Sequence, residues 1–176
     1  DSPITPEEVC EVINSLPNNK APGPDGLTTN FYKVYADILA PHLVAVYAAV
    51  FEAGSLSPSM REAIVVSLLK QGNASDICDS YRPLSLINTD TKILAKLLAR
   101  RLALLLPKIV RPDQTGFIPG RATSHNLRTL FSLIHRIRPD LPAVAVFLDA
   151  TKAFDTLKWY YLFIVLDRMG LGHQFI

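Results

Sequence analysis

The stretch Val144–Asp155, VAVFLDATKAFD, decides the fold prediction for this chain. Its first residues are apolar and uncharged, which is typical of a strand covered on both faces, so we expect a strand over residues 143–149. Such a strand would carry the carboxylate of Asp149 to its C-terminal end, where acidic residues commonly bind divalent metal ions. Taken alone this signal is ambiguous, because an isolated aspartate at the end of a strand also serves as a helix cap or a turn former.

The composition indicates a folded protein or part of one. The chain has 176 residues, of which 49% are hydrophobic, and this is enough to bury a core. It begins without methionine, shows no signal peptide and has no apolar run that we expect to span a membrane. We therefore expect an excerpt of a longer intracellular protein. The two cysteines, Cys10 and Cys78, lie far apart in polar contexts and predict no disulfide framework.

The net charge of +2 conceals an uneven distribution of charge along the chain. Residues 1–79 carry four Lys and Arg against ten Asp and Glu, a balance of −6. Residues 80–140 carry eleven against three, a balance of +8, and the remaining residues are balanced at three against three. A basic middle segment is typical of proteins that bind a phosphate backbone.

Capping residues, apolar periodicity and prolines predict the elements of the chain. We expect helices over residues 6–16, 28–39, 41–53, 88–106, 123–138 and 157–169. Pro41 is expected to separate the second helix from the third. The second is expected to present an apolar face formed by Phe31, Val34, Tyr35 and Ile38. Short β-branched or apolar runs predict strands over residues 63–70 and 84–87.

Several common chemistries have no support in the sequence. It contains no GxSxG elbow, no GxxxxGK phosphate loop and no HExxH, and its four histidines lack the spacing of metal ligands. A phosphotransferase of the haloacid-dehalogenase type would need an aspartate where Thr151 stands. A receiver domain would need an acidic pair upstream of Asp149, and residues 140–148 do not supply one.

Four sequence blocks lie along most of the chain: KAPGPDGLTTNFYK at 20–33, SLLK at 67–70 with YRPLSLIN at 81–88, QTGFIPGR at 114–121 and FLDATKAFD at 147–155. In this order they resemble the reverse transcriptase of non-LTR (LINE-type) retrotransposons. A series of blocks in family order is far more specific than any single motif. The resemblance implies an α+β fold, a partial right-hand polymerase that is mostly helical with a few short antiparallel strands. Residues 1–140 would form a fingers-like region with an N-terminal extension, and residues 141–176 the start of the palm.

The resemblance also implies a metal-dependent nucleotidyl transfer. The complete enzyme would use two Mg²⁺ ions, with Asp149 as a catalytic metal ligand and the backbone carbonyl of Ala150 as a second contact. Phe154 would pack under the sugar of the incoming nucleotide and exclude a 2′-hydroxyl. The backbone amides around Lys152 and Ala153 would face the triphosphate.

The resemblance further implies that several basic residues of this chain contact phosphates. Lys70 and Arg82 match positions that clamp the phosphates of the incoming nucleotide, for which a compact ammonium and a forked guanidinium are suited. Template or primer backbone contacts are expected from Lys92, Lys96, Arg100, Arg121 and Arg128. For these five residues a solvated helix face is an alternative interpretation.

The parent protein would synthesise DNA from deoxynucleoside triphosphates on an RNA template, primed at chromosomal DNA. It would act as a ribonucleoprotein in the cytoplasm and nucleus, without a membrane partner. The later motifs that supply the paired aspartates of such enzymes do not occur in these residues, so the isolated chain is expected to be inactive. Two alternatives stay open at this point: an RNA-binding module, or a remnant of such an element without a function of its own.

Overall fold

The computed structural model describes residues 2–72, 74–137, 144–150, 153–173 and 175–176. They divide into two compact units, Ser2–Arg100 and Arg101–Ile176, and each is described here by itself. Helix α5 (Thr89–Ile109) begins in the first unit and ends in the second. The predicted division between residues 140 and 141 falls within residues 138–143, which lie outside the described residues, and it stays a prediction.

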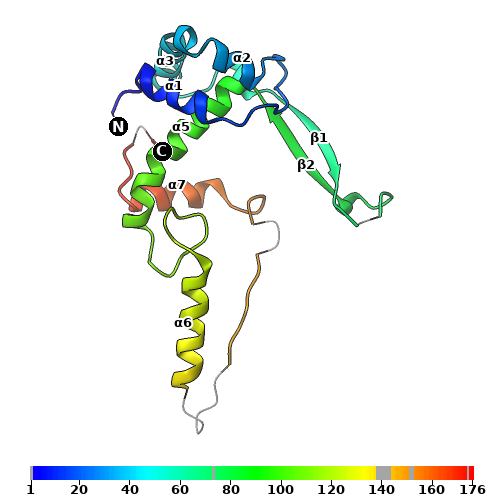
Figure 1. Cartoon of the computed structure of the whole chain (residues 1–176), viewed down its shortest axis with the longest axis vertical. Coiled ribbons are helices and arrows are strands. Elements are labelled where there is room, and N and C mark those ends of the chain that lie inside the picture. The colour runs from blue at the N-terminus through cyan, green and yellow to red at the C-terminus, as the bar shows by residue number, and fades with distance from the viewer. Residues whose placement is uncertain (1, 73, 138–143, 151–152, 174) are drawn as a thin grey trace. The chain divides into compact units, whose positions relative to one another are not determined.

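The first unit contains helices gathered around the start of α5, as Figure 1 shows. They are α1 (Pro6–Ser15), α2 (Thr29–Val34), α3 (Ala36–Ala53) and the single turn α4 (Pro58–Arg61). The predicted N-terminus of α1 is confirmed, because the Thr5 hydroxyl accepts a hydrogen bond from the backbone N–H of Glu8 at 3.3 Å. The predicted helix at 88–106 is confirmed as α5, extended by one turn.

The core of this unit consists of apolar side chains from α1, α2, α3 and α5 together with Met60. Its buried members are Val9, Val12, Ile13, Leu16, Tyr32, Ala36, Ala40, Leu43, Tyr47, Met60, Ile93, Leu94 and Leu97. On α3 the buried positions follow one another three or four residues apart, which places them on one stripe of the helix. The spacing of apolar residues in the sequence thus positions three long helices around one interior.

The helix boundary near Pro41 differs from the prediction. Helix α2 ends at Val34 and α3 runs through Pro41, so the break lies at Tyr35. Pro41 is on the exposed side of α3, and the carbonyl that loses its hydrogen-bond donor there, on Asp37, is on an exposed residue and can bond to water instead.

The expected apolar face of the second helix is also wrong. Val34 and Ile38 are 74% and 65% exposed, and Phe31 and Tyr35 are exposed as well. Tyr32 and Ala36 enter the core in their place. The buried positions Thr29, Tyr32, Ala36 and Ala40 follow one another three or four residues apart across the break at Tyr35, so the core lies on the other side of the helix from the predicted face.

Helix α3 corrects a further expectation. Its 18 residues have a mean hydropathy of 1.4, so by length and composition it is long and apolar enough to cross a membrane. Core helices of proteins outside membranes meet the same criterion, and α3 contributes Ala40, Leu43 and Tyr47 to the interior described above. Its apolar character is therefore accounted for in part by packing.

An antiparallel hairpin projects from the helices of the first unit (Figure 1). Strand β1 (Ala63–Leu69) pairs with β2 (Tyr81–Ile87) in a register that runs from Ala63 opposite Ile87 to Leu69 opposite Tyr81. The 3₁₀ turn η1 (Cys78–Ser80) precedes β2. The first predicted strand is confirmed, and the second begins three residues earlier than expected because the register continues to Tyr81.

The second unit contains α6 (Thr123–Arg136) and α7 (Trp159–Arg168). Within its described residues, the predicted strand at 143–149 is wrong: Val144–Asp149 form no regular secondary structure, and Val144 and Leu148 are 87% and 92% exposed. A strand needs a neighbour to pair its backbone N–H and C=O groups, and no described segment pairs with this one. Ala143 lies outside the described residues.

The base of the hairpin is joined to the loop between α1 and α2 by Asn88. This side chain is only 3% exposed; its Oδ1 accepts from the backbone N–H of Asp25 at 3.2 Å and its Nδ2 donates to the carbonyl of Ser59 at 3.0 Å. The next residue, Thr89, donates from its hydroxyl to the carbonyl of Leu27 at 2.8 Å. The loop lies so close that a Cβ on Gly23 would overlap the amide oxygen and the backbone nitrogen of Asn88.

We predict that Gly23→Ala destabilises the chain by about 1–3 kcal/mol, because the added methyl must displace the backbone of Asn88. The measurement is urea-induced unfolding followed by far-UV circular dichroism. Gly116→Ala is the matched control, since a Cβ there meets only the side chain of Gln114 at an ordinary 3.6 Å. Equal unfolding midpoints for Gly23→Ala and the parent would contradict the close approach.

A second prediction concerns alkaline pH. Burial raises the pKa of Tyr32 to about 12 and raises that of Tyr47 as well, with the Asp90 carboxylate adding to both effects. Because the unfolded chain ionises first, near pH 10, the free energy of unfolding falls as the pH rises above about 10. The Tyr47 hydroxyl donates to the Asp90 carbonyl at 2.8 Å, so Tyr47→Phe is expected to cost about 1 kcal/mol at pH 7.

Between about pH 9 and pH 11, on either side of the tyrosine pKa of about 10, the free energy of unfolding should fall less for Tyr47→Phe than for the parent. Urea unfolding midpoints of both proteins at several pH values make the comparison. Parallel curves for the two proteins would show that Tyr47 does not contribute to the alkaline loss.

Candidate nucleotide and nucleic-acid site

The hairpin places Lys70 and Arg82 on the same face. Arg82 lies opposite Leu68 in the register, and Lys70 follows Leu68 by two residues, so the side chains of Lys70 and Arg82 are diagonal neighbours. The backbone N–H of Lys70 donates to the carbonyl of Ser80 at 2.7 Å, which continues the pairing beyond Leu69. The ammonium of Lys70 donates to the carbonyl of Asp79 at 2.6 Å.

The two cations thus stand at the outer end of the hairpin, across the strands from each other. Their face of the hairpin also carries Ile64, Val66 and Leu84, all of which are exposed. Separated by a loop in the sequence, Lys70 and Arg82 are brought together by strand pairing alone. An anionic group placed over this end would be within reach of both side chains.

The stripe of Lys92, Lys96 and Arg100 on α5 has partners within the chain. Lys92 donates to the carbonyl of Ala21 and Lys96 to the carbonyl of Ser15, each at 3.0 Å. Arg100 forms an ion pair with Glu11 at 3.1 Å. Ser15 is the last residue of α1, where carbonyls lack helical partners and attract a positive charge. Through these contacts the stripe holds α1 and the loop after it against α5. The predicted nucleic-acid contacts of the three residues stay predictions.

Arg121 has a similar internal role in the second unit. Its guanidinium donates to the carbonyls of Gln114 at 2.8 Å, Val110 at 2.9 Å and Pro107 at 3.0 Å, and also to the carbonyl of Arg111. These are carbonyls of the last turn of α5 and of the loop that follows it. The planar fork of an arginine suits this arrangement, because its donors diverge in one plane. Arg128, by contrast, is exposed on α6.

The residues around the predicted catalytic aspartate are open to solvent. Asp149 and Ala150 are exposed, as are Ala153 and Phe154, the last with 85% of its surface accessible. Lys152 lies outside the described residues. Asp149 belongs to the second unit, whereas Lys70 and Arg82 belong to the first.

The metal prediction can be compared with the donors present. The carboxylate of Asp149 and the carbonyl of Ala150 are hard oxygens of the kind that Mg²⁺ prefers. Among the described residues, however, no group of three or more His, Cys, Asp or Glu side chains could hold a metal ion. The described residues therefore do not form a metal centre by themselves, and a two-metal site would need carboxylates beyond them.

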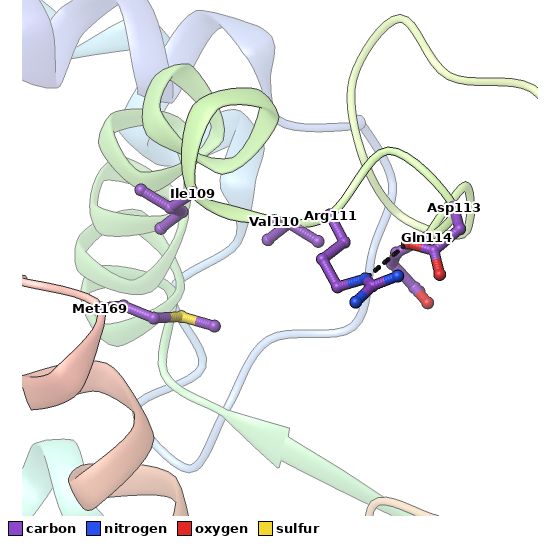
Figure 2. Close-up of a pocket in the computed structure, with 6 residues that line it drawn as sticks. All are labelled: Ile109, Val110, Arg111, Asp113, Gln114 and Met169. Atoms are coloured by element: carbon purple, nitrogen blue, oxygen red, sulfur yellow. Dashed lines mark hydrogen bonds and ion pairs between the residues drawn. The ribbon is translucent and has the colours of Figure 1, made fainter.

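An open pocket of about 380 Å³ lies beside the end of α5, as Figure 2 shows. Ile109, Val110 and Met169 line its apolar side, and Arg111, Asp113 and Gln114 line its polar side. Arg111 and Asp113 are paired at 3.1 Å, and the hydrogen bond from Arg111 lowers the pKa of the Asp113 carboxyl. This polar side therefore carries a compensated pair of charges.

The hydrogen bonds of Asn88 and the internal role of Arg121 were not predicted from the sequence. The signals that were present are the glycine between two prolines in PGPDG, which indicates a close backbone approach, and an asparagine at the junction of a strand and a helix. Neither signal names its partner, because Asp25 and Ser59 lie 63 and 29 residues from Asn88.

Comparison with known proteins places this arrangement in a family. The family model "Reverse transcriptase (RNA-dependent DNA polymerase)" matches residues 68–176, which include Lys70, Arg82 and Asp149 and make up more than half of the chain. The chain belongs to the reverse transcriptase family.

Its relatives are proteins of transposable elements. The chain is 36% identical over its whole length to the transposon TX1 uncharacterized 149 kDa protein of Xenopus laevis. Over 90% of its length it is 30% identical to the probable RNA-directed DNA polymerase from transposon BS and, likewise, to the RNA-directed DNA polymerase from mobile element jockey, both of Drosophila melanogaster. The matches cover 14% of the length of the first relative and 18% of each of the other two. These names confirm the resemblance to non-LTR retrotransposon reverse transcriptases.

We predict that Arg121→Lys loosens the loop after α5, because one ammonium cannot reach four carbonyls. Limited digestion with trypsin, followed by mass spectrometry, should show cleavage after the exposed Lys108 rising roughly tenfold, as expected for the loss of about 1.4 kcal/mol of local stability. Arg128→Lys is the matched control and should leave this cleavage rate unchanged. Equal rates for the Arg121 variant and the parent would refute the role assigned to the four hydrogen bonds.

Proposed function

We propose that this chain supplies the fingers and the first palm segment of an RNA-directed DNA polymerase. In this proposal residues 1–140 belong to the fingers with an N-terminal extension, and residues 141–176 begin the palm. The observation that carries it is the pairing of Lys70 and Arg82 on one face of a hairpin, within residues that match the reverse transcriptase family. Two of its relatives are named as RNA-directed DNA polymerases.

The Lys70–Arg82 pair would bind the triphosphate of an incoming deoxynucleotide. A triphosphate offers several anionic oxygens at once, so it can engage a forked guanidinium and a point-like ammonium together. The ammonium of Lys70 already lies against the carbonyl of Asp79 and would have to exchange or share this partner. The pairing of the strands places the backbones of Lys70 and Arg82 diagonally across the hairpin before the nucleotide arrives.

Asp149 would be the catalytic carboxylate. We propose that it binds Mg²⁺ together with the carbonyl of Ala150, and that further carboxylates of the whole protein complete the site for two ions. When bound, such ions activate the attacking hydroxyl and stabilise the leaving pyrophosphate. The exposed ring of Phe154 would lie under the nucleotide sugar and exclude a 2′-hydroxyl, and the amides around Lys152 and Ala153 would face the triphosphate.

The whole protein would bind an RNA template and a DNA primer at a chromosomal target inside the cell. The backbone contacts are proposed first for Arg128, which is exposed. Lys92, Lys96, Arg100 and Arg121 could add to these contacts only by leaving or sharing their present partners.

The test is a chimaera in which this chain replaces the matching segment of the jockey polymerase of Drosophila melanogaster. We expect the chimaera to extend a DNA primer on an RNA template and Asp149→Asn to reduce the rate by at least about a thousandfold, since a missing metal ligand disables the chemical step. Asp155→Asn is the matched control, because its carboxylate is not assigned to a metal, and it should retain most of the activity.

Circular dichroism and retained RNA binding would show that the Asp149 variant is folded. Full primer extension by the Asp149→Asn chimaera would contradict the proposed catalytic role of Asp149. The chain by itself is expected to extend no primer, because its described residues hold no group of three metal-binding side chains.

A second candidate function is RNA binding without catalysis, and the observation in its favour is the balance of +8 over residues 80–140. It predicts an affinity for RNA that falls steeply with salt. The two candidates differ in the chimaera: a pure binding module would retain RNA binding but would give a chimaera that extends no primer even with Asp149 present.

A further inference from the structure

The backbone at Phe117 has an unusual conformation. Its φ is +60°, and the only other described residue besides glycine with a positive φ is Asn19, a residue type that adopts this region readily. A bulky side chain in this region costs of the order of 1–3 kcal/mol, which persists only where the surroundings impose it. Phe117 is also 93% exposed, so packing of its ring within the described residues does not repay that cost.

The loop around Phe117 is held in place on both sides. Thr115 is buried and its hydroxyl accepts from the Asn126 side chain at 3.0 Å, while the carbonyl of Gly116 accepts from the Gln114 side chain at 3.2 Å. On the other side Ile118 is buried, and its carbonyl accepts from the backbone N–H of Arg121 at 3.2 Å. The ring is therefore presented to solvent by a fixed backbone.

The segment of sequence around the ring is basic. Residues 107–128 contain Lys108, Arg111, Arg121 and Arg128 against Asp113. Arg121 is held by backbone carbonyls and Arg111 is paired with Asp113, so Lys108 and Arg128 carry the excess charge of this segment. Lys108, Arg111 and Arg128 are exposed. In sequence, Phe117 is flanked by Gly116 and by the buried Ile118.

We propose that Phe117 is a stacking platform for a base of single-stranded nucleic acid. An exposed aromatic ring on a fixed loop, within a basic segment whose cations can follow the phosphates, is the combination by which proteins bind single strands without reading their sequence. A protein partner would instead favour a contiguous apolar patch. The inference rests on the proposed function, because the strand that supplies the base is the RNA template or its overhang.

The test compares two single-stranded RNA oligonucleotides of equal length, one natural and one with abasic sites, by fluorescence anisotropy with the whole chain. The abasic strand keeps the phosphates and removes the bases. The parent is expected to bind the natural strand about tenfold more tightly than the abasic strand, and Phe117→Gly should remove this preference. Phe117→Trp should keep or increase it, since indole stacks on bases at least as well.

Phe117→Gly separates stacking from structure, because glycine adopts a positive φ without strain. The variant should unfold at the same urea concentration as the parent or at a higher one, while its preference for natural RNA is lost. The matched control is Phe131→Leu on α6, which removes another exposed ring of the same unit and should keep the preference.

The outcomes are distinct. If the parent binds RNA but does not prefer the natural strand, or if Phe117→Gly keeps that preference, the stacking role is overturned and the proposed function stands. If the parent binds neither strand, both the stacking role and the RNA contact of this chain are overturned. If sedimentation shows self-association that Phe117→Gly abolishes, the ring belongs to a protein interface and the proposal is wrong.

Discussion

The hydrogen bonds of the Asn88 carboxamide are the constraint on which the first unit depends. This one buried group joins the loop after α1, the turn α4 and the start of α5, and Gly23 permits the approach by having no Cβ. Asn88 also immediately follows β2. The hairpin is therefore anchored where the helical core begins, and the direction of its outer end, with Lys70 and Arg82, is set from there.

Some basic residues in this chain bind backbone carbonyls of the chain itself, and others are exposed. Lys96 and Arg121 bind backbone carbonyls near the ends of α1 and α5, where a helix leaves acceptors without partners. Others, such as Arg128, are exposed. The +8 balance of residues 80–140 therefore overstates the charge that is available to a nucleic acid. Net charge identifies a class of partner, whereas the geometry of each cation decides which of them can reach it.

The sequence predicted the local elements well, because their signals are local. The Thr5 cap, the apolar spacing of α5 and the β-branched run of β1 each determine a structure within a few residues. The pairing of Lys70 with Arg82 could be anticipated from a family resemblance, and strand register then supplied its geometry.

The differences from prediction depend on partners distant in the sequence or on whether a position is exposed, and a local pattern contains neither. Val144–Asp149 reads as a strand, but a strand exists only when another segment pairs with it. Pro41 reads as a break, but its exposed position lets α3 continue through it. The partners of Asn88 and the strained φ of Phe117 depend on contacts and turns that composition does not reveal.

Hydrogen exchange at the backbone amide of Asp25 tests the central claim most directly, since this amide donates to Asn88. We expect it to open with a free energy within about 1 kcal/mol of that of the Leu97 amide in the core of the same unit. The exposed stretch around Val146 should exchange much faster. An Asp25 amide that exchanges as fast as that of Val146 would contradict the account, because the hydrogen bond between Asp25 and Asn88 would then not be formed in solution.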